Sequence, residues 1–139
     1  MKKAKAYLYI LKTLNDAIDR SMRRLEKIRA EMFGMSGMDY SKDRVQVSPE
    51  DRLSAAMAEY VDLDAEINRM IDGYVDLKRE VYGRISGMEN RTHREILFRR
   101  FINGQSVPFT AKLMKRSERW VYRKQSEALR AFETQYLVE

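Results

Sequence analysis

Apolar residues spaced three and four positions apart limit the fold of this chain more than any other feature of its sequence. Between residues 3 and 33 an α-helix would place these positions on one face, so the spacing predicts an amphipathic helix. Gly34 follows the last of them, at the position where helices prefer to end. The regular spacing favours coiled-coil-like pairing over packing on a globular core, which is the alternative. The positions are Leu8, Leu11, Leu14, Ile18, Met22, Leu25, Ile28 and Met32.

A second and longer helix is predicted over residues 49–86. Ser48 is suited to cap it, and a proline stands at its first position, ahead of two acidic residues that match the helix dipole. At 1.5 Å per residue this helix would be about 57 Å long. Gly73 and Gly83 would each weaken it by about 1 kcal/mol relative to alanine, and Gly87 is expected to end it. Its apolar positions are Leu53, Met57, Tyr60, Leu63, Ile67, Met70 or Ile71, Tyr74, Leu77, Val81 and Ile85.

The two long helices have opposite charges and are separated by a predicted linker at residues 34–48, which is punctuated by glycine and serine. Residues 1–33 carry nine Lys and Arg against four Asp and Glu, whereas residues 49–88 carry five against nine. This complementarity favours an antiparallel helical hairpin. The same apolar positions are also able to pair between two chains and form a dimer.

The composition excludes several classes of protein. No cysteine is present, so disulfides and cysteine-based metal sites are excluded, in keeping with a cytoplasmic location. His93 is the only histidine, and we expect neither a metal nor a cofactor. No apolar run approaches the ~18 residues that span a bilayer, and the N-terminus lacks a signal-peptide cleavage site. No catalytic arrangement or phosphate-binding loop is recognisable, so we expect no enzyme activity.

Three shorter helices are predicted in residues 89–139. The first covers residues 91–103 after a possible cap at Asn90, and the second begins at a Ser106 cap. The third runs over residues 117–132, starting at the Ser117 cap. The fold class is therefore all-α, with a coiled-coil-like hairpin domain at residues 1–88 and a helix-turn-helix domain at residues 89–139. Expected core residues of this second domain are Ile96, Leu97, Phe101, Ile102, Phe109, Ala111, Leu113, Val121, Ala128, Leu129 and Phe132.

A basic turn, Lys115-Arg116-Ser117, precedes the last helix, whose first turns carry polar and basic side chains on the outer face. This arrangement is typical of a recognition helix that enters the major groove of double-stranded DNA. The alternative is a small helical domain with solvated charges. The predicted DNA-binding residues are Ser117, Glu118, Arg119, Tyr122, Arg123 and Lys124 on the reading helix, with Lys112, Lys115, Arg116, Arg99 and Arg100 for the phosphates. Gln125 is expected to flank the reading face, and Trp120 to wedge against the helix at residues 91–103.

The stretch ILFRRFINGQSVPFTAKLMKRSERWVYRKQSEALRAF resembles region four of sigma factors, and more closely the RinA/ArpU-type late transcriptional regulators of Gram-positive phages and mobile elements. The linker piece at residues 44–49 also resembles a short motif of some members. The resemblance rests on Leu97, Arg100, Phe101, Ile102, Gly104, Ser106, Ala111, Leu113, Ser117, Val121, Tyr122, Arg123, Ala128, Leu129 and Phe132.

This resemblance implies sequence-specific DNA binding and control of late phage genes. It also implies contact with RNA polymerase as a further function. Two positions depart from the family pattern: Val107-Pro108 replaces an aromatic residue, and Thr110 replaces an apolar one. The departures imply a shorter or shifted second helix. Residues 1–88 contain no recognisable promoter-melting domain, which favours a regulator over a complete sigma factor.

Two other functions fit the same pattern. A small-terminase-like phage packaging protein also joins a DNA-binding module to a helical oligomerisation region, and it would form a ring of many subunits. A coiled-coil protein-interaction module would instead show no affinity for DNA at low salt.

Overall fold

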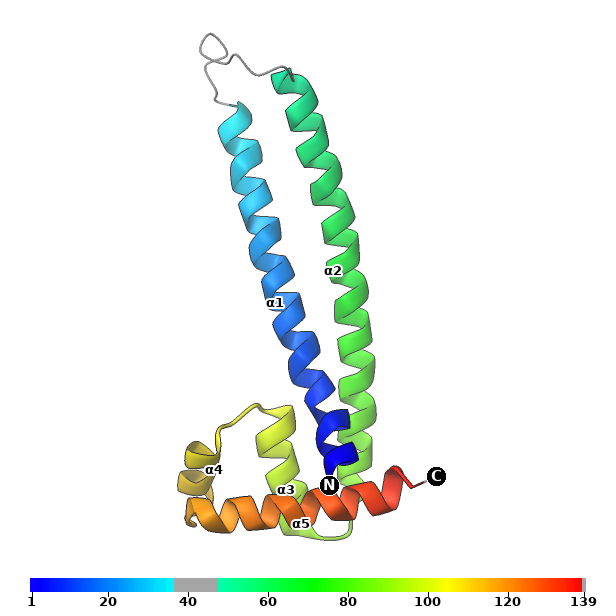
Figure 1. The fold of residues 1–139 in the computed structure, drawn as a ribbon, viewed down its shortest axis with the longest axis vertical. Helices are drawn as coiled ribbons and strands as arrows, with labels where there is room; N and C mark the ends of the chain where they lie inside the picture. Colours follow the sequence, from blue (N-terminus) through cyan, green and yellow to red (C-terminus); the bar gives the residue numbers. More distant parts are fainter. Residues whose placement is uncertain (37–47, 139) are drawn as a thin grey trace. The chain divides into compact units, whose positions relative to one another are not determined.

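The computed structural model describes residues 1–36 and 48–138, and throughout these residues the regular secondary structure is helical (Figure 1). The all-α prediction is therefore confirmed for the described chain. Most of the predicted linker, residues 37–47, lies outside the described residues. In chain order the helices are α1 (Lys2–Ser36), α2 (Pro49–Ser86), α3 (Arg91–Leu97), the π-helix η2 (Phe98–Ile102), α4 (Val107–Met114) and α5 (Glu118–Tyr136).

The two long helices follow the predicted boundaries except at the end of α1. The Ser48 hydroxyl accepts a hydrogen bond from the Asp51 amide at 3.1 Å, which confirms the predicted cap of α2. Helix α2 continues through both of its internal glycines. Gly34 was predicted to end α1, but the helix runs on to Ser36. A glycine inside a helix costs only about 1 kcal/mol, so it does not by itself stop one.

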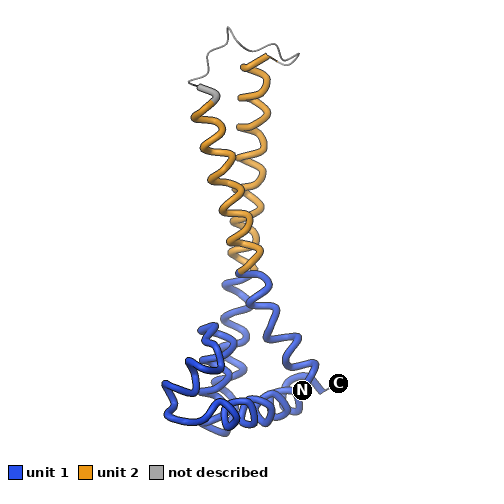
Figure 2. Tube along the Cα trace, turned by 60° about the vertical axis from the view of Figure 1, so that its left-hand side comes forward, with its two compact units in different colours: residues 1–15, 74–139 blue, residues 16–73 orange. Residues whose placement is uncertain are grey.

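Contacts divide the described chain into two compact units, which Figure 2 shows in different colours. Unit 1 combines residues 1–15 with residues 74–139, and unit 2 consists of residues 16–73. Helices α1 and α2 each contribute residues to both units. The predicted domain boundary between residues 88 and 89 stays a prediction.

Unit 2 is held together by apolar contacts between α1 and α2. Ile28 of α1 is buried with Leu63 and Ile67 of α2. Arg24 and Glu59 form an ion pair at 2.7 Å, but both side chains are exposed, so the pair contributes at most about 1 kcal/mol. The stability of this unit therefore comes mainly from its buried apolar side chains. Those packed around the three buried residues are Leu25, Met32, Tyr60 and Met70.

Two of the predicted core positions in unit 2 are wrong. Met22 and Met57 are about half exposed, whereas Ala56 is buried and Ser21 is half-buried. The structure also places Met70, rather than Ile71, against the core. Apolar residues spaced three and four apart repeat every 3.5 residues on average, whereas an ideal helix has 3.6 residues per turn. The predicted apolar face therefore rotates slowly around the helix, and every few turns a neighbouring position is buried instead.

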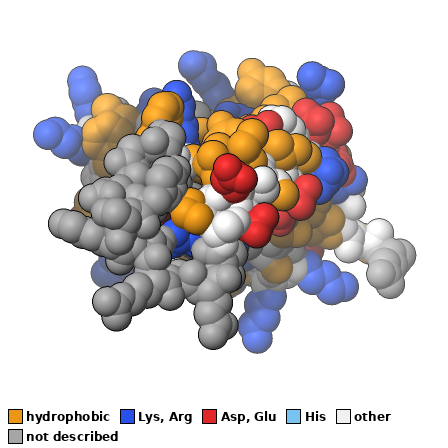
Figure 3. Space-filling model, turned by 90° about the horizontal axis from the view of Figure 1, so that it is seen from above, with side chains coloured by type: hydrophobic (Ala, Val, Ile, Leu, Met, Phe, Trp, Pro, Cys, Tyr) orange, Lys and Arg blue, Asp and Glu red, His pale blue; other side chains and the backbone are white. Residues whose placement is uncertain are grey.

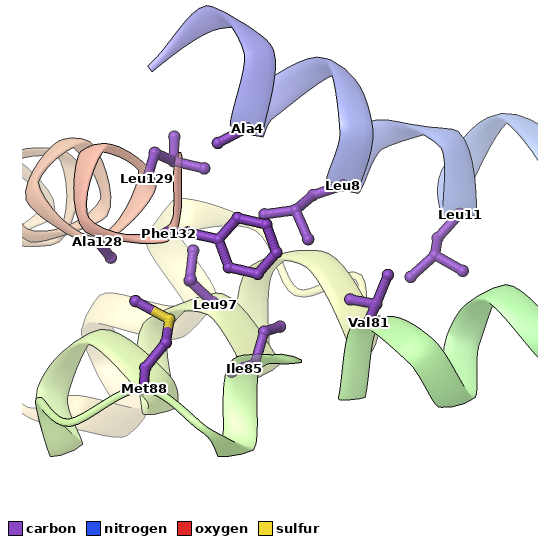
Figure 4. Close-up of a cluster of buried hydrophobic side chains, with 10 residues drawn as sticks. All are labelled: Ala4, Leu8, Leu11, Val81, Ile85, Met88, Leu97, Ala128, Leu129 and Phe132. Carbon is purple, nitrogen blue, oxygen red and sulfur yellow. The ribbon is translucent and has the colours of Figure 1, made fainter. Parts of the chain in front are cut away.

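The larger core lies in unit 1 and joins four helices (Figure 4). Phe132 of α5 is fully buried and stacks on Tyr7 of α1, with ring centroids 5.8 Å apart. Glu133, the next residue, accepts a hydrogen bond from the Ala4 amide at 3.1 Å and pairs with the Met1 amino group at 2.6 Å. It thereby satisfies one of the free N–H groups in the first turn of α1. The buried cluster contains Ala4, Leu8, Leu11, Val81, Ile85, Met88, Leu97, Ala128, Leu129 and Phe132.

The helix predicted at residues 91–103 changes its hydrogen-bonding pattern halfway. The Asn90 side chain accepts from the His93 amide at 3.0 Å, which confirms the predicted cap. After Leu97 the chain continues as the π-helix η2, whose wider turn ends with a 2.8 Å bond from the Asn103 amide to the Phe98 carbonyl. Gly104 follows with φ of +66°, a conformation that glycine adopts without strain. The sequence pattern did not distinguish this turn from an α-helix.

Candidate nucleic-acid interface

Helices α4 and α5 are joined by a short turn with defined hydrogen bonds. The Ser106 hydroxyl accepts from the Phe109 amide at 3.2 Å and begins α4, as predicted. Lys115 ends α4 in the left-handed region, at φ 56° and ψ 46°. The Arg116 amide then donates to the Ala111 carbonyl at 3.0 Å, which is one of the two bonds of a Schellman motif.

The first turn of α5 is fixed in the same way. The Ser117 hydroxyl accepts a hydrogen bond from the Trp120 amide at 3.1 Å, so the predicted cap is confirmed. Only Lys115, Arg116 and Ser117 separate the two helices, which is the basic turn expected from the sequence. The start of α5 is therefore held at a defined position next to the end of α4.

A small apolar core holds α4 against α5. Val107 and Ala111 of α4 are buried together with Val121 of α5, and Trp120 packs against them while remaining partly exposed. The Arg116 guanidinium lies over the Trp120 ring, 5.0 Å from its centroid. Trp120 was expected to wedge against the helix at residues 91–103, but its packing partners are on α4. The preceding helix meets α5 further along the chain instead, where Leu97 lies beside Ala128 and Leu129.

The opposite side of the start of α5 is open to solvent. We call residues 118–123 the leading end of α5. Arg119 and Arg123 are both exposed, one helical turn apart, and Tyr122 between them is 57% exposed. Within residues 1–36 and 48–138, neither arginine has a hydrogen-bonding or ionic partner. Also exposed are Glu118 at the same end of α5, Ser117 and Arg116 in the turn, and Lys112 and Lys115 on α4 and at its end.

Three other predicted binding residues already have partners in the chain. Lys124 pairs with Glu127 at 3.1 Å, and this contact, ahead of a weaker one from His93, lowers the pKa of the Glu127 carboxyl. Arg99 pairs with Glu95 at 3.2 Å. The third residue, Arg100, is considered next because its partners explain how α5 is positioned.

Arg100 connects the π-helix, the following loop and α5. Its Nε donates to the Gln125 side-chain carbonyl at 2.7 Å, and its Nη1 donates to the Gln105 backbone carbonyl. Gln125 was expected to flank the reading face, but it is buried. Its burial is tolerated because the Arg100 guanidinium donates a hydrogen bond to the oxygen of its side-chain amide. Arg100 therefore supports the position of α5 from behind.

Helix α4 is rotated relative to the sequence-based prediction. Phe109 and Leu113 were expected to face inward, yet they are 48% and 45% exposed. Val107 and Thr110 are buried in their place, beside Ala111, which is buried as predicted. The inward face is determined by the contact with Val121 and Trp120 on α5, which the periodicity of an eight-residue helix does not reveal.

Thr110 is fully buried, and its hydroxyl has no hydrogen-bond partner within the described part of the chain. A buried hydroxyl without a partner is destabilising, because it has lost its bonds to water. This is one of the two positions at which the sequence departs from the pattern of the family that it resembles.

A hollow on α3 and η2 is lined by three arginines, Arg91, Arg94 and Arg99, together with Glu95. Arg94 donates to the backbone carbonyl of Met88 at 2.6 Å, and Arg99 is paired with Glu95. Two of its three guanidinium groups are thus engaged, which makes this hollow a weaker anion site than the leading end of α5.

The described residues contain no group of three or more His, Asp or Glu that is able to hold a metal ion. His93 lies 3.7 Å from Glu127 and is largely buried. In the same residues, no helix combines the length and the apolar character needed to cross a membrane. Comparison of the chain with protein families, with curated proteins and with solved structures finds no match.

Proposed function

We propose that the protein is a sequence-specific DNA-binding regulator in which α4, the basic turn and α5 form a helix-turn-helix, with α5 as the recognition helix. The observation that carries this proposal is the division of α5 into two sides. Val121, Leu129 and Phe132 are buried, whereas Arg119 and Arg123 are exposed and have no partner among the residues that the structure describes. A helix anchored on one side and basic on the other, with an accessible leading end, has the form that major-groove binding requires.

The exposed residues differ in their proposed roles. Arg119 and Arg123 are suited to donate two hydrogen bonds each to the major-groove edge of guanine, and Glu118 is suited to accept from cytosine. Lys112, Lys115 and Arg116 would neutralise phosphates, together with the free N–H groups at the start of α5. Arg99, Arg100 and Lys124 are weaker candidates, since each already binds another residue of the chain. Arg100 is instead a positioning residue.

We further propose that α1 and α2 form an antiparallel hairpin by which two copies associate, so that two recognition helices act on one duplex. The pairing of α1 with α2 is supported within each unit, since Leu8 lies in one cluster with Val81 in unit 1, and Ile28 in one cluster with Leu63 in unit 2. The resemblance to RinA/ArpU-type regulators favours late-gene control in a phage or mobile element, in the bacterial cytoplasm and through contact with RNA polymerase.

The test begins with selection of duplexes from a random-sequence pool by the purified protein. Recovery of a defined motif is expected, and binding to it should weaken steeply as salt increases. Fluorescence anisotropy then compares the motif with a scrambled duplex. For Arg119→Ala and Arg123→Ala we expect affinity for the motif to fall by about 1–3 kcal/mol, with relaxed preference at one base pair each.

Two variants serve as controls. Arg130→Ala removes an exposed arginine from the later part of α5 and is expected to leave the base preference unchanged. Lys115→Ala should weaken binding to both duplexes equally and reduce the salt dependence by about one phosphate contact. Equal loss across all sequences for Arg123→Ala would contradict a reading role. Absence of binding at low salt would favour the interaction module, and a ring-sized mass would favour the packaging protein.

A further inference from the structure

Helix α2 carries a second apolar face besides the one that packs on α1. Met57, Val61, Ile71 and Val75 are between 37% and 64% exposed. At 3.6 residues per turn, these four positions lie within roughly 80° of one another around the helix axis. They lie about 100° away from the buried face that contains Leu63. In the view from above in Figure 3, apolar side chains lie at the surface next to acidic ones.

This second face repeats with the spacing of a coiled coil. Positions 57, 61, 64, 68, 71, 75, 78 and 82 alternate steps of four and three, and five of the eight are apolar. The remaining three are Asp64, Asn68 and Lys78. A strict seven-residue repeat on an exposed face is the pattern by which one helix packs along another. Because α1 is packed against the other face, positions 57–75 of this one are available to a different molecule, whereas Tyr82 at its end already contacts Phe98, with ring centroids 5.0 Å apart.

We propose that this face of α2 binds α2 of a second copy of the chain, with the two helices antiparallel. In a parallel dimer, Asp64 would face Asp64 and Lys78 would face Lys78, and both like-charge contacts are unfavourable. In the antiparallel arrangement the seven-residue repeats match when position 57 lies opposite position 82. Asp64 of one copy is then about one helical turn from Lys78 of the other, within reach of the long lysine side chain.

The dimer in the proposed function would form through this face of α2, so the inference rests on that function. Its test uses no DNA, so a failure of the dimer and a failure of DNA binding can be distinguished. Sedimentation equilibrium of the full chain over a range of concentrations is expected to show a mass of about 33 kDa, twice the 16.5 kDa of one chain. Val61→Glu should raise the dissociation constant at least tenfold. The matched control is Val138→Glu, since Val138 is 70% exposed and lies outside α2. Its dissociation constant should equal that of the wild type.

The orientation is tested by exchanging charges. Asp64→Lys alone should weaken the dimer, and Asp64→Lys combined with Lys78→Asp should restore it, because the opposite charges meet again only in the antiparallel dimer. Circular dichroism verifies that each variant keeps its helices. A monomer at all concentrations, or a dimer unaffected by Val61→Glu, overturns the proposal. Failure of the double exchange to restore the dimer overturns the antiparallel arrangement.

Discussion

Replacing Thr110 by valine removes a buried hydroxyl without changing the shape of the side chain. The hydroxyl is fully buried and lacks a partner among the described residues, so its desolvation is not compensated. Burial of such a group costs about 1–3 kcal/mol in proteins. Valine and threonine have similar helix propensities, so the backbone contributes almost nothing to the difference. We expect Thr110→Val to stabilise the protein by about 1 kcal/mol, or roughly 2–4 °C in the unfolding midpoint.

Trp120 offers a direct assay for this change. It is the only tryptophan, and it packs against the cluster of Val107, Ala111 and Val121 beside which Thr110 lies on α4. Urea unfolding followed by its fluorescence therefore reports on this part of the fold. Thr134→Val is the matched control, because Thr134 is an exposed threonine in α5 and its replacement should change stability by less than about 0.5 kcal/mol.

The opposite substitution provides a second check. Thr110→Ser keeps the hydroxyl and removes the buried methyl group, so we expect a loss of about 1 kcal/mol. If Thr110→Val destabilised the protein instead, the hydroxyl would have to make a hydrogen bond that contributes to folding. That result would refute the reasoning that the site is better suited to an apolar side chain.

Three further predictions concern the contacts that hold α5. Phe132→Ala should cost about 3–5 kcal/mol in urea unfolding because it leaves a cavity in the core of unit 1, and Phe132→Leu should cost less. Gln125→Ala should cost about 1.5–3 kcal/mol because it leaves the Arg100 guanidinium without its partner on α5. The control is Thr134→Ala, at an exposed position of the same helix, and a loss no larger than that of the control would show that this bond is unimportant. The pKa of the Glu133 carboxyl is held below its ordinary value of 4.5 by the Met1 amino group first and by the Ala4 amide second. Its contribution to stability is therefore present above pH 4.5 and is lost as the pH falls through and below that value. Unfolding at several pH values should show a smaller dependence in this range for Glu133→Gln than for the wild type, and identical curves would contradict the assignment.

Local sequence signals predicted the helices and most of their ends. Ser48, Asn90, Ser106 and Ser117 each cap the helix expected of them. A cap depends on a side chain and an amide three residues apart, so it can be recognised without knowledge of the fold. The two-sided character of α5 was predicted in the same way, since a 19-residue helix contains enough turns for its apolar face to be unambiguous.

Residues whose place depends on another helix were predicted less well. The sequence did not distinguish Ser21 from Met22, or Ala56 from Met57, because adjacent positions differ by one step around a helix and only the partner helix selects between them. The π-helix at Phe98–Ile102 has no local signal of its own.

The sequence by itself determined where this chain is helical and which residues begin each helix, because hydrogen bonds between near neighbours encode those features. Only the tertiary structure decided that Phe109 and Leu113 face solvent and that Gln125 is buried against Arg100. In an eight-residue helix such as α4, several faces are similarly apolar, and the burial of one of them depends on which side chains the neighbouring helix presents. A polar residue such as Gln125 can be buried only where another group forms a hydrogen bond with it. That group is Arg100, and because the two residues are far apart in the sequence, no local pattern predicts the bond between them.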